Sequence, residues 1–247
     1  MDKQEILKST VKSIFGAVPF GGTALNELFF EYSSQIKQKR LNRFVEILEK
    51  YFIEGSDINI ENIKTENFND LFESVLRKVV QTKSELKLIR FKDILIRELN
   101  SPSENAELND HYLDLISNLT EMEISILYNH RYFTMEYEEK INELNRLNDN
   151  LSPLTRQLGN AKGTNKESDF QKPYEDLKKY IDSLSKYKHA EFYELSENSF
   201  MFYKQRLFSK GLLIDDRMKR IGSLPFVNMG ITEFGIEFID FIKNSDK

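Results

Sequence analysis

The chain has 247 residues, of which 35 are Lys or Arg and 40 are Asp or Glu, so its formal net charge is -5. It contains no cysteine, which excludes a disulfide framework, a thiol nucleophile, an iron–sulfur cluster and every cysteine-ligated zinc site. The low numbers of Gly (10) and Pro (5) argue against a β-sandwich or β-barrel and favour a mainly helical protein, and the lack of cysteine suits a reducing cytoplasm.

The most apolar segment covers residues 14–30, with the sequence IFGAVPFGGTALNELFF. It is shorter than the roughly 20 apolar residues of a membrane-spanning helix and is interrupted by glycines, a proline and an acid. Two interpretations stay open. Either the segment links two helices that pack on the domain, or it is an effector segment that associates with a membrane or self-assembles. Its candidate residues are Phe15, Pro19, Phe20, Gly21, Gly22, Leu25, Leu28 and Phe29.

Apolar residues three and four apart predict three helices between residues 35 and 99. The first is expected over residues 35–52, the second is capped by Asn67 or Asn69, and the third ends before Pro102. Basic residues on these helices form either a surface for phosphate groups or anionic lipid, or ordinary solvated helix faces. The candidate basic patch consists of Lys37, Lys39, Arg40, Arg43, Lys83, Lys87 and Arg90.

Beyond residue 100, helix and strand signals follow the order of a winged-helix module. Thr120 and Glu123 form a capping box, Ser196 caps a later helix that Gly211 ends, and Thr232 caps a last helix over residues 233–242. Between these helices, residues 212–214 and 226–231 are predicted strands on either side of a charged hairpin tip over residues 215–224.

The polar segment 100–110 is the predicted boundary between two domains. The expected fold is mainly α, with an N-terminal helical domain over residues 1–100 and a winged-helix-like α+β domain over residues 101–247. A helical hairpin over about residues 129–192, with a flexible tip at about 159–171, interrupts the second domain. This hairpin serves as an interaction arm, as a contact between two copies of the chain, or as a structural buttress.

Positive charge also gathers around the predicted wing. A winged helix with these residues would contact either nucleic acid or a protein partner, although the acidic net charge of -5 lacks the electrostatic footprint of a committed DNA-binding protein. The candidate contact residues are Lys204, Arg206, Arg217, Lys219 and Arg220.

Catalytic motifs are missing from the sequence. It contains no GxxxxGK[ST], GxGxxG, HExxH or GxSxG pattern. The three histidines, His111, His130 and His189, are far apart, and His130 is expected on a helix surface or at a helix end. We therefore expect no enzymatic activity, no metal and no cofactor.

Three phrases carry a resemblance to the abortive-infection alpha family of bacterial phage-defence proteins. They are SIFGAVPFGGTALNELFFEYSSQIKQKRLNRFVEIL, YLDLISNLTEMEISIL and LFSKGLLIDD followed by ITEFGIEFIDFI. The resemblance implies a cytoplasmic protein that halts growth or kills the infected cell, and it supplies no catalytic residues.

Together with the residue patterns, this resemblance predicts a defence protein that acts through its N-terminal effector segment and senses a phage or host protein through the winged-helix domain. Further expected partners are the anionic surface of the inner membrane when the protein is active, nucleic acid, and a second copy of the chain. The alternatives are a winged-helix DNA-binding regulator and a cryptic nuclease.

Overall fold

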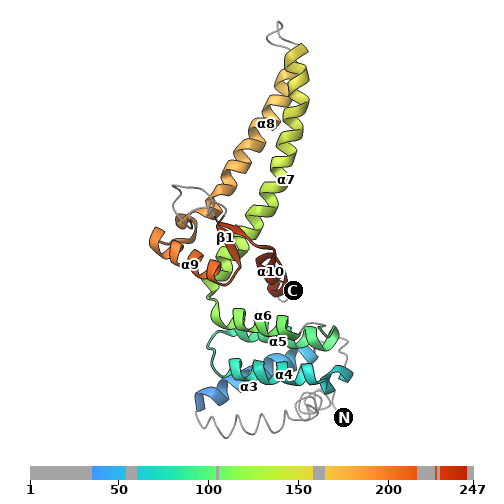
Figure 1. The fold of residues 1–247 in the computed structure, drawn as a ribbon, viewed down its shortest axis with the longest axis vertical. Coiled ribbons are helices and arrows are strands. Elements are labelled where there is room, and N and C mark those ends of the chain that lie inside the picture. The colour runs from blue at the N-terminus through green and yellow to red at the C-terminus, as the bar shows by residue number, and fades with distance from the viewer. Residues whose placement is uncertain are drawn as a thin grey trace. The chain divides into compact units, whose positions relative to one another are not determined.

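The computed structural model describes residues 35–53, 60–103, 106–157, 165–215, 226 and 229–243. These residues are mostly helical, with eight α-helices, three short 3-10 helices and a small antiparallel sheet of two strands (Figure 1). Contacts divide the chain into two compact units, one of residues 1–119 with 242–247 and the other of residues 120–241. The predicted effector segment and most of the wing tip lie outside the described residues.

The first unit is a small bundle of helices. It contains α3 (Gln35–Ile53), the 3-10 helix η1 (Ile60–Lys64), α4 (Glu66–Val79), α5 (Glu85–Asn100) and α6 (Ala106–Asn118). Because α6 packs against α4 and α5, the division between the units falls after Leu119 and not in the segment 100–110 that the sequence indicated.

Apolar spacing explains why α4 forms and which side of it is covered. Six apolar side chains recur along one stripe of this helix and are all buried, namely Phe68, Leu71, Phe72, Val75, Leu76 and Val79. Phe44 of α3 and Phe91 of α5 are fully buried in the same unit. Burying an aromatic side chain of this size contributes about 1.5–3 kcal/mol, so this apolar core stabilises the unit.

The N-terminus of α4 differs from the prediction. Thr65 caps the helix, since its Oγ1 accepts a hydrogen bond from the backbone N–H of Phe68 at 3.3 Å. The expectation that Asn67 or Asn69 would be the cap is wrong, because both lie inside the helix. The side-chain amide of Asn69 instead donates to the carbonyl of Thr65 at 2.7 Å.

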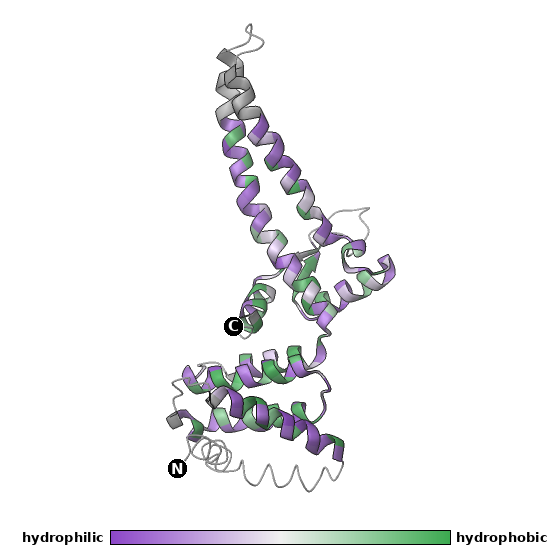
Figure 2. Cartoon of the chain, turned by 180° about the vertical axis from the view of Figure 1, so that it is seen from behind, coloured by the Kyte–Doolittle hydropathy of each residue, from purple (hydrophilic) through white to green (hydrophobic). Residues whose placement is uncertain are grey.

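The second unit consists of a long helical hairpin and a small α+β part. Its elements are α7 (Glu121–Gln157), α8 (Asn165–Leu184), the 3-10 helices η2 (Ser185–Lys188) and η3 (Ala190–Tyr193), α9 (Glu197–Ser209), β1 (Leu213–Asp215), β2 (Met229–Ile231) and most of α10 (Glu233–Lys243). Helices α7 and α8 lie side by side (Figure 1), and hydrophilic residues predominate along them (Figure 2).

The predicted capping box starts α7. The backbone N–H and the hydroxyl of Thr120 donate to Glu123 Oε2 at 2.7 and 2.9 Å, and Glu123 N–H donates to Thr120 Oγ1 at 3.2 Å. The helix then continues without a break through residue 129, where the hairpin was expected to begin. Helix α8 starts at Asn165, inside the predicted tip 159–171, and residues 158–164 lie outside the description.

The two strands pair in antiparallel order, with Leu213 opposite Ile231 and Asp215 opposite Met229. Gly211, at a φ of 71°, takes the left-handed conformation that ends α9, as predicted. Thr232 caps α10, also as predicted, because its Oγ1 accepts a hydrogen bond from Gly235 N–H at 2.9 Å.

Candidate functional site

Three arginines of the predicted basic patch are engaged or buried within the first unit. Arg40 Nη1 donates to the carbonyl of Val80 at 2.8 Å. Arg43 forms ion pairs with Glu46 and Glu85, which connects α3 to the start of α5. Arg90 is buried, so it is not part of an exposed basic surface. At these three positions the cations are thus engaged with, or buried among, other residues of the first unit.

Two lysines of the patch, Lys83 and Lys87, instead line a hollow of about 340 Å³ together with Lys78. The remaining lining residues are Gln81, Thr82, Phe91, Ser117 and Asn118. The hollow lies between the loop that joins α4 to α5 and the last turn of α6. We call it the lysine pocket.

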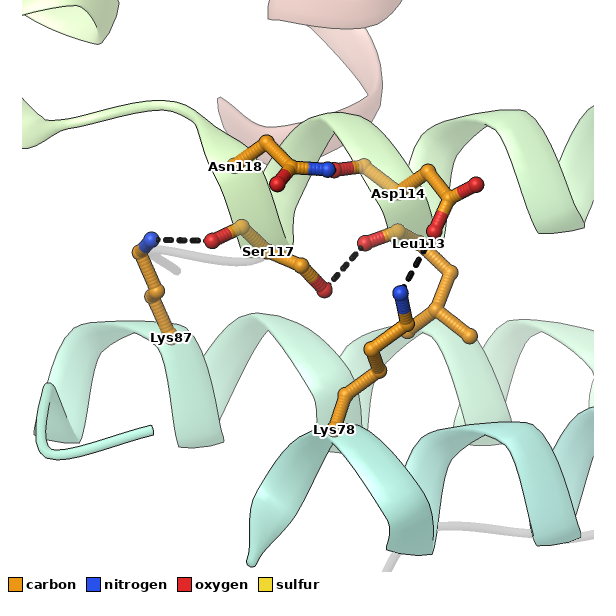
Figure 3. Close-up of polar contacts among 6 residues, drawn as sticks. All are labelled: Lys78, Lys87, Leu113, Asp114, Ser117 and Asn118. Carbon is orange, nitrogen blue, oxygen red and sulfur yellow. Dashed lines mark hydrogen bonds and ion pairs between the residues drawn. The ribbon is translucent and has the colours of Figure 1, made fainter. Parts of the chain in front are cut away.

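Lys78 and Lys87 reach from α4 and α5 to the C-terminal turn of α6 (Figure 3). Lys78 Nζ lies 2.6 Å from Asp114 Oδ1, and Lys87 Nζ donates to the carbonyl of Ser117 at 2.6 Å. A cation at the C-terminus of a helix interacts favourably with the helix dipole and with the last carbonyls. These two bonds consequently fix both ammonium groups at one side of the pocket.

Lys83 differs from the other two lysines. It follows the end of α4, its side chain is exposed, and within the described part of the chain it has no charged or hydrogen-bonding partner. Among the described residues that line the pocket, three are lysines and none is acidic, and Asp114 pairs with Lys78 beside it. The pocket can therefore attract an anion, which the sequence indicated only as a stretch of basic residues.

In the second unit, Lys204, one of the candidate contact residues for nucleic acid or a protein partner, is buried. Its ammonium lies 4.6 Å from the centre of the Phe200 ring. Burial lowers the pKa of Lys204 below its usual value, while the charges of Glu197 and Asp215 act in the opposite direction. The ammonium group of this lysine thus interacts with residues inside the unit.

Arg206, a second predicted contact residue, also serves the interior. Its Nε lies 3.0 Å from Oε1 of Glu123, whose side chain is fully buried. This ion pair is close, yet its atoms are not aligned for hydrogen bonding, and Oε1 accepts no hydrogen bond from the described residues. Arg206 therefore neutralises a buried carboxylate. The other three candidates, Arg217, Lys219 and Arg220, lie outside the description.

His130 is buried within the N-terminal third of α7 and not at a helix surface or end, so that prediction is wrong. Its Nδ1 lies 2.9 Å from the carbonyl of Ile126, one turn earlier. Burial lowers the pKa of His130 to about 4, opposed by the bond to Ile126 and helped by the charges of Lys188 and Lys204. Within the described ranges, acidic and histidine side chains form no group that could hold a metal ion.

A chain of aromatic rings connects the hairpin to the interior of the second unit. Tyr132 of α7 contacts Tyr187, Tyr187 contacts Phe192, Phe192 contacts Tyr193, and Tyr193 stacks on Phe200, with centroid separations of 4.9–5.5 Å. We call these five residues the aromatic chain. Its last ring, Phe200, is buried, whereas its central ring, Phe192, is 42% exposed at the surface.

The sequence interpretation did not find the aromatic chain. Its central part comes from residues 186–193, KYKHAEFY, which hold three aromatic residues and two lysines within eight positions. Lys186 Nζ lies 5.1 Å from the centre of the Tyr187 ring and 6.0 Å from that of Phe192. This concentration of aromatic residues is the available signal in the sequence, although the predicted hairpin over residues 129–192 includes most of the segment.

Comparison with known proteins adds no relative, since no family model, curated protein or solved structure matches the chain. Among the helices of the described residues, none combines the length and the apolar character needed to cross a lipid bilayer.

Proposed function

We propose that this chain is a phage-defence protein of the abortive-infection type, which acts without enzymatic chemistry and binds a phage or host protein through its second unit. The observation that carries the proposal is the aromatic chain, which presents Phe192 at the surface from a rigid base. The family assignment rests on the three phrases of the sequence that resemble abortive-infection alpha proteins. The winged-helix-like arrangement of this unit belongs to the same proposal.

An exposed aromatic residue on a rigid support is suited to anchor a protein partner. Aromatic residues, Phe included, are enriched in the core of protein interfaces, where a few residues carry most of the binding energy. Phe192 packs edge-to-face on Tyr187 and Tyr193, so it loses little side-chain freedom when a partner covers it. Lys186 beside the ring supplies the polar rim that surrounds such anchors.

The second unit exposes further large apolar side chains, which lie outside the aromatic chain. They are Tyr128, Met135, Tyr137, Tyr180, Phe202 and Ile214. By contrast, Lys204 and Arg206 are engaged inside the unit, which favours a protein partner over the alternative of a DNA-binding regulator. The N-terminal effector segment, residues 14–30, would then act at the inner membrane or by self-assembly once the partner is bound.

A plaque assay tests the proposal in cells that express the chain. Phe192→Asp should abolish protection against a phage that the wild type restricts, because it places a charge at the anchor. Phe202→Asp is the matched control, since Phe202 is an equally large exposed ring of the same unit outside the aromatic chain. It should keep most of the protection, and circular dichroism should show both variants folded.

Two results would contradict the proposal. If a folded Phe192→Asp variant gives full protection, the aromatic chain is not the binding site for the partner. If the wild-type chain restricts no phage of a broad panel, the protein is not a phage-defence protein. Phe20→Asp separates the effector step, since this variant should bind the same partner in a pull-down yet leave the infected culture growing.

A further inference from the structure

The geometry points to the lysine pocket of the first unit as a binding site for a phosphate group. This inference is independent of the proposed defence function, because it rests on different residues in a different unit. The pocket volume of about 340 Å³ lies near the lower end of the range for small-molecule sites, about 300–1,000 Å³. It therefore admits a phosphate together with part of the molecule that carries it.

The donors around the pocket match the needs of a phosphate. Three lysines, Lys78, Lys83 and Lys87, line the pocket from α4, the following loop and α5. An ammonium carries three N–H donors, so Lys78 can hold Asp114 and still donate to a ligand oxygen. Gln81 and Thr82 add uncharged donors from the same loop. Phosphate oxygens accept several such bonds at once.

Two features of the pocket distinguish it from an ordinary solvated helix face. First, Lys78 and Lys87 are held by hydrogen bonds to Asp114 and to the carbonyl of Ser117 (Figure 3). Their side chains are therefore already ordered in the folded protein, and they lose less conformational entropy when a ligand binds. Second, Lys83 remains exposed at the pocket without a partner among the described residues, although neighbouring cations such as Arg40 and Arg43 are engaged. A ligand phosphate would complete its coordination.

Calorimetric titration of the full chain at low salt tests the site with three probes: inorganic phosphate, ATP, and vesicles of phosphatidylglycerol compared with phosphatidylcholine. The soluble probes report a phosphorylated small molecule, and the anionic vesicles report a lipid headgroup. Lys83→Glu should weaken binding of the effective probe about tenfold, because it reverses a charge next to a multiply charged anion. Lys83→Gln should weaken it by less.

Lys64→Glu is the matched control, since it makes the same charge change at an exposed lysine of the first unit outside the pocket. It should change the affinity less than twofold. Binding of ATP or phosphate with this pattern supports a soluble ligand, and binding of anionic vesicles alone with this pattern supports a lipid phosphate. The inference is overturned if no probe binds at millimolar concentration, or if Lys64→Glu weakens binding as much as Lys83→Glu.

Discussion

Replacing His130 by Gln should remove a pH dependence from the stability of the second unit. The histidine is buried in α7, and burial holds its pKa at about 4, whereas an unfolded chain has a histidine pKa of about 6.5. Between these two values the unfolded chain binds a proton that the folded unit does not bind. The folded state therefore loses stability as the pH falls from about 6.5 toward 4.

The size of the effect follows from the same two pKa values. Between pH 7 and pH 4.5, protonation of His130 in the unfolded chain should lower the free energy of unfolding by about 2.5 kcal/mol. Gln is neutral throughout this range. His130→Gln should thus cost stability at pH 7, where the native packing is lost, and the difference between variant and wild type should shrink by about 2.5 kcal/mol at pH 4.5.

Urea unfolding at several pH values measures this difference. Hydrogen exchange of peptides from α7, followed by mass spectrometry, reports on the second unit separately from the first. His189→Gln is the control, because it makes the same substitution at an exposed histidine of the same unit. If wild type and His130→Gln have parallel pH curves, His130 is not held neutral by burial and the reasoning is refuted.

Three further substitutions test the local interactions by urea unfolding. Thr120→Ala removes the capping box and should cost about 1 kcal/mol, whereas an unchanged midpoint would contradict the role of this cap. Arg206→Met leaves the carboxylate of Glu123 buried without its cation and should cost about 3–5 kcal/mol, much of which Glu123→Gln should restore in the double variant. Gly235→Ala should cost about 1–3 kcal/mol, because a Cβ there would lie 2.4 Å from the carbonyl oxygen of Leu212; a neutral effect would mean that the backbone relaxes easily.

Features set by neighbours in the sequence could be predicted, and those set by distant contacts could not. Thr120, Gly211 and Thr232 each act within a few residues, and the structure confirms all three at the expected helix ends. The cap of α4 failed although it is local, because the segment TENFN offers three capping residues and the apolar stripe alone does not choose Thr65.

The candidate site residues show the same limit. Lys83 and Lys87 were recognised as basic, but their pocket exists only because the last turn of α6 lies against α5. The sequence predicts Arg206 and Lys204 as surface cations. It does not indicate that Arg206 pairs with Glu123, which is distant in the sequence, or that Lys204 lies over the ring of Phe200. Composition and spacing predict where a charged side chain lies along a helix. Whether that side chain forms an internal ion pair or faces solvent depends on which elements pack against it.

The unbroken course of α7 has a mechanical consequence. No Gly or Pro occurs between Glu121 and Asp149, so this part of the helix has no residue at which it would readily bend. At 1.5 Å per residue these positions are about 42 Å apart, and a tilt of 10° at one end moves the other by about 7 Å. A small tilt at the base of α7, where His130 is buried, is therefore converted into a large displacement along the hairpin.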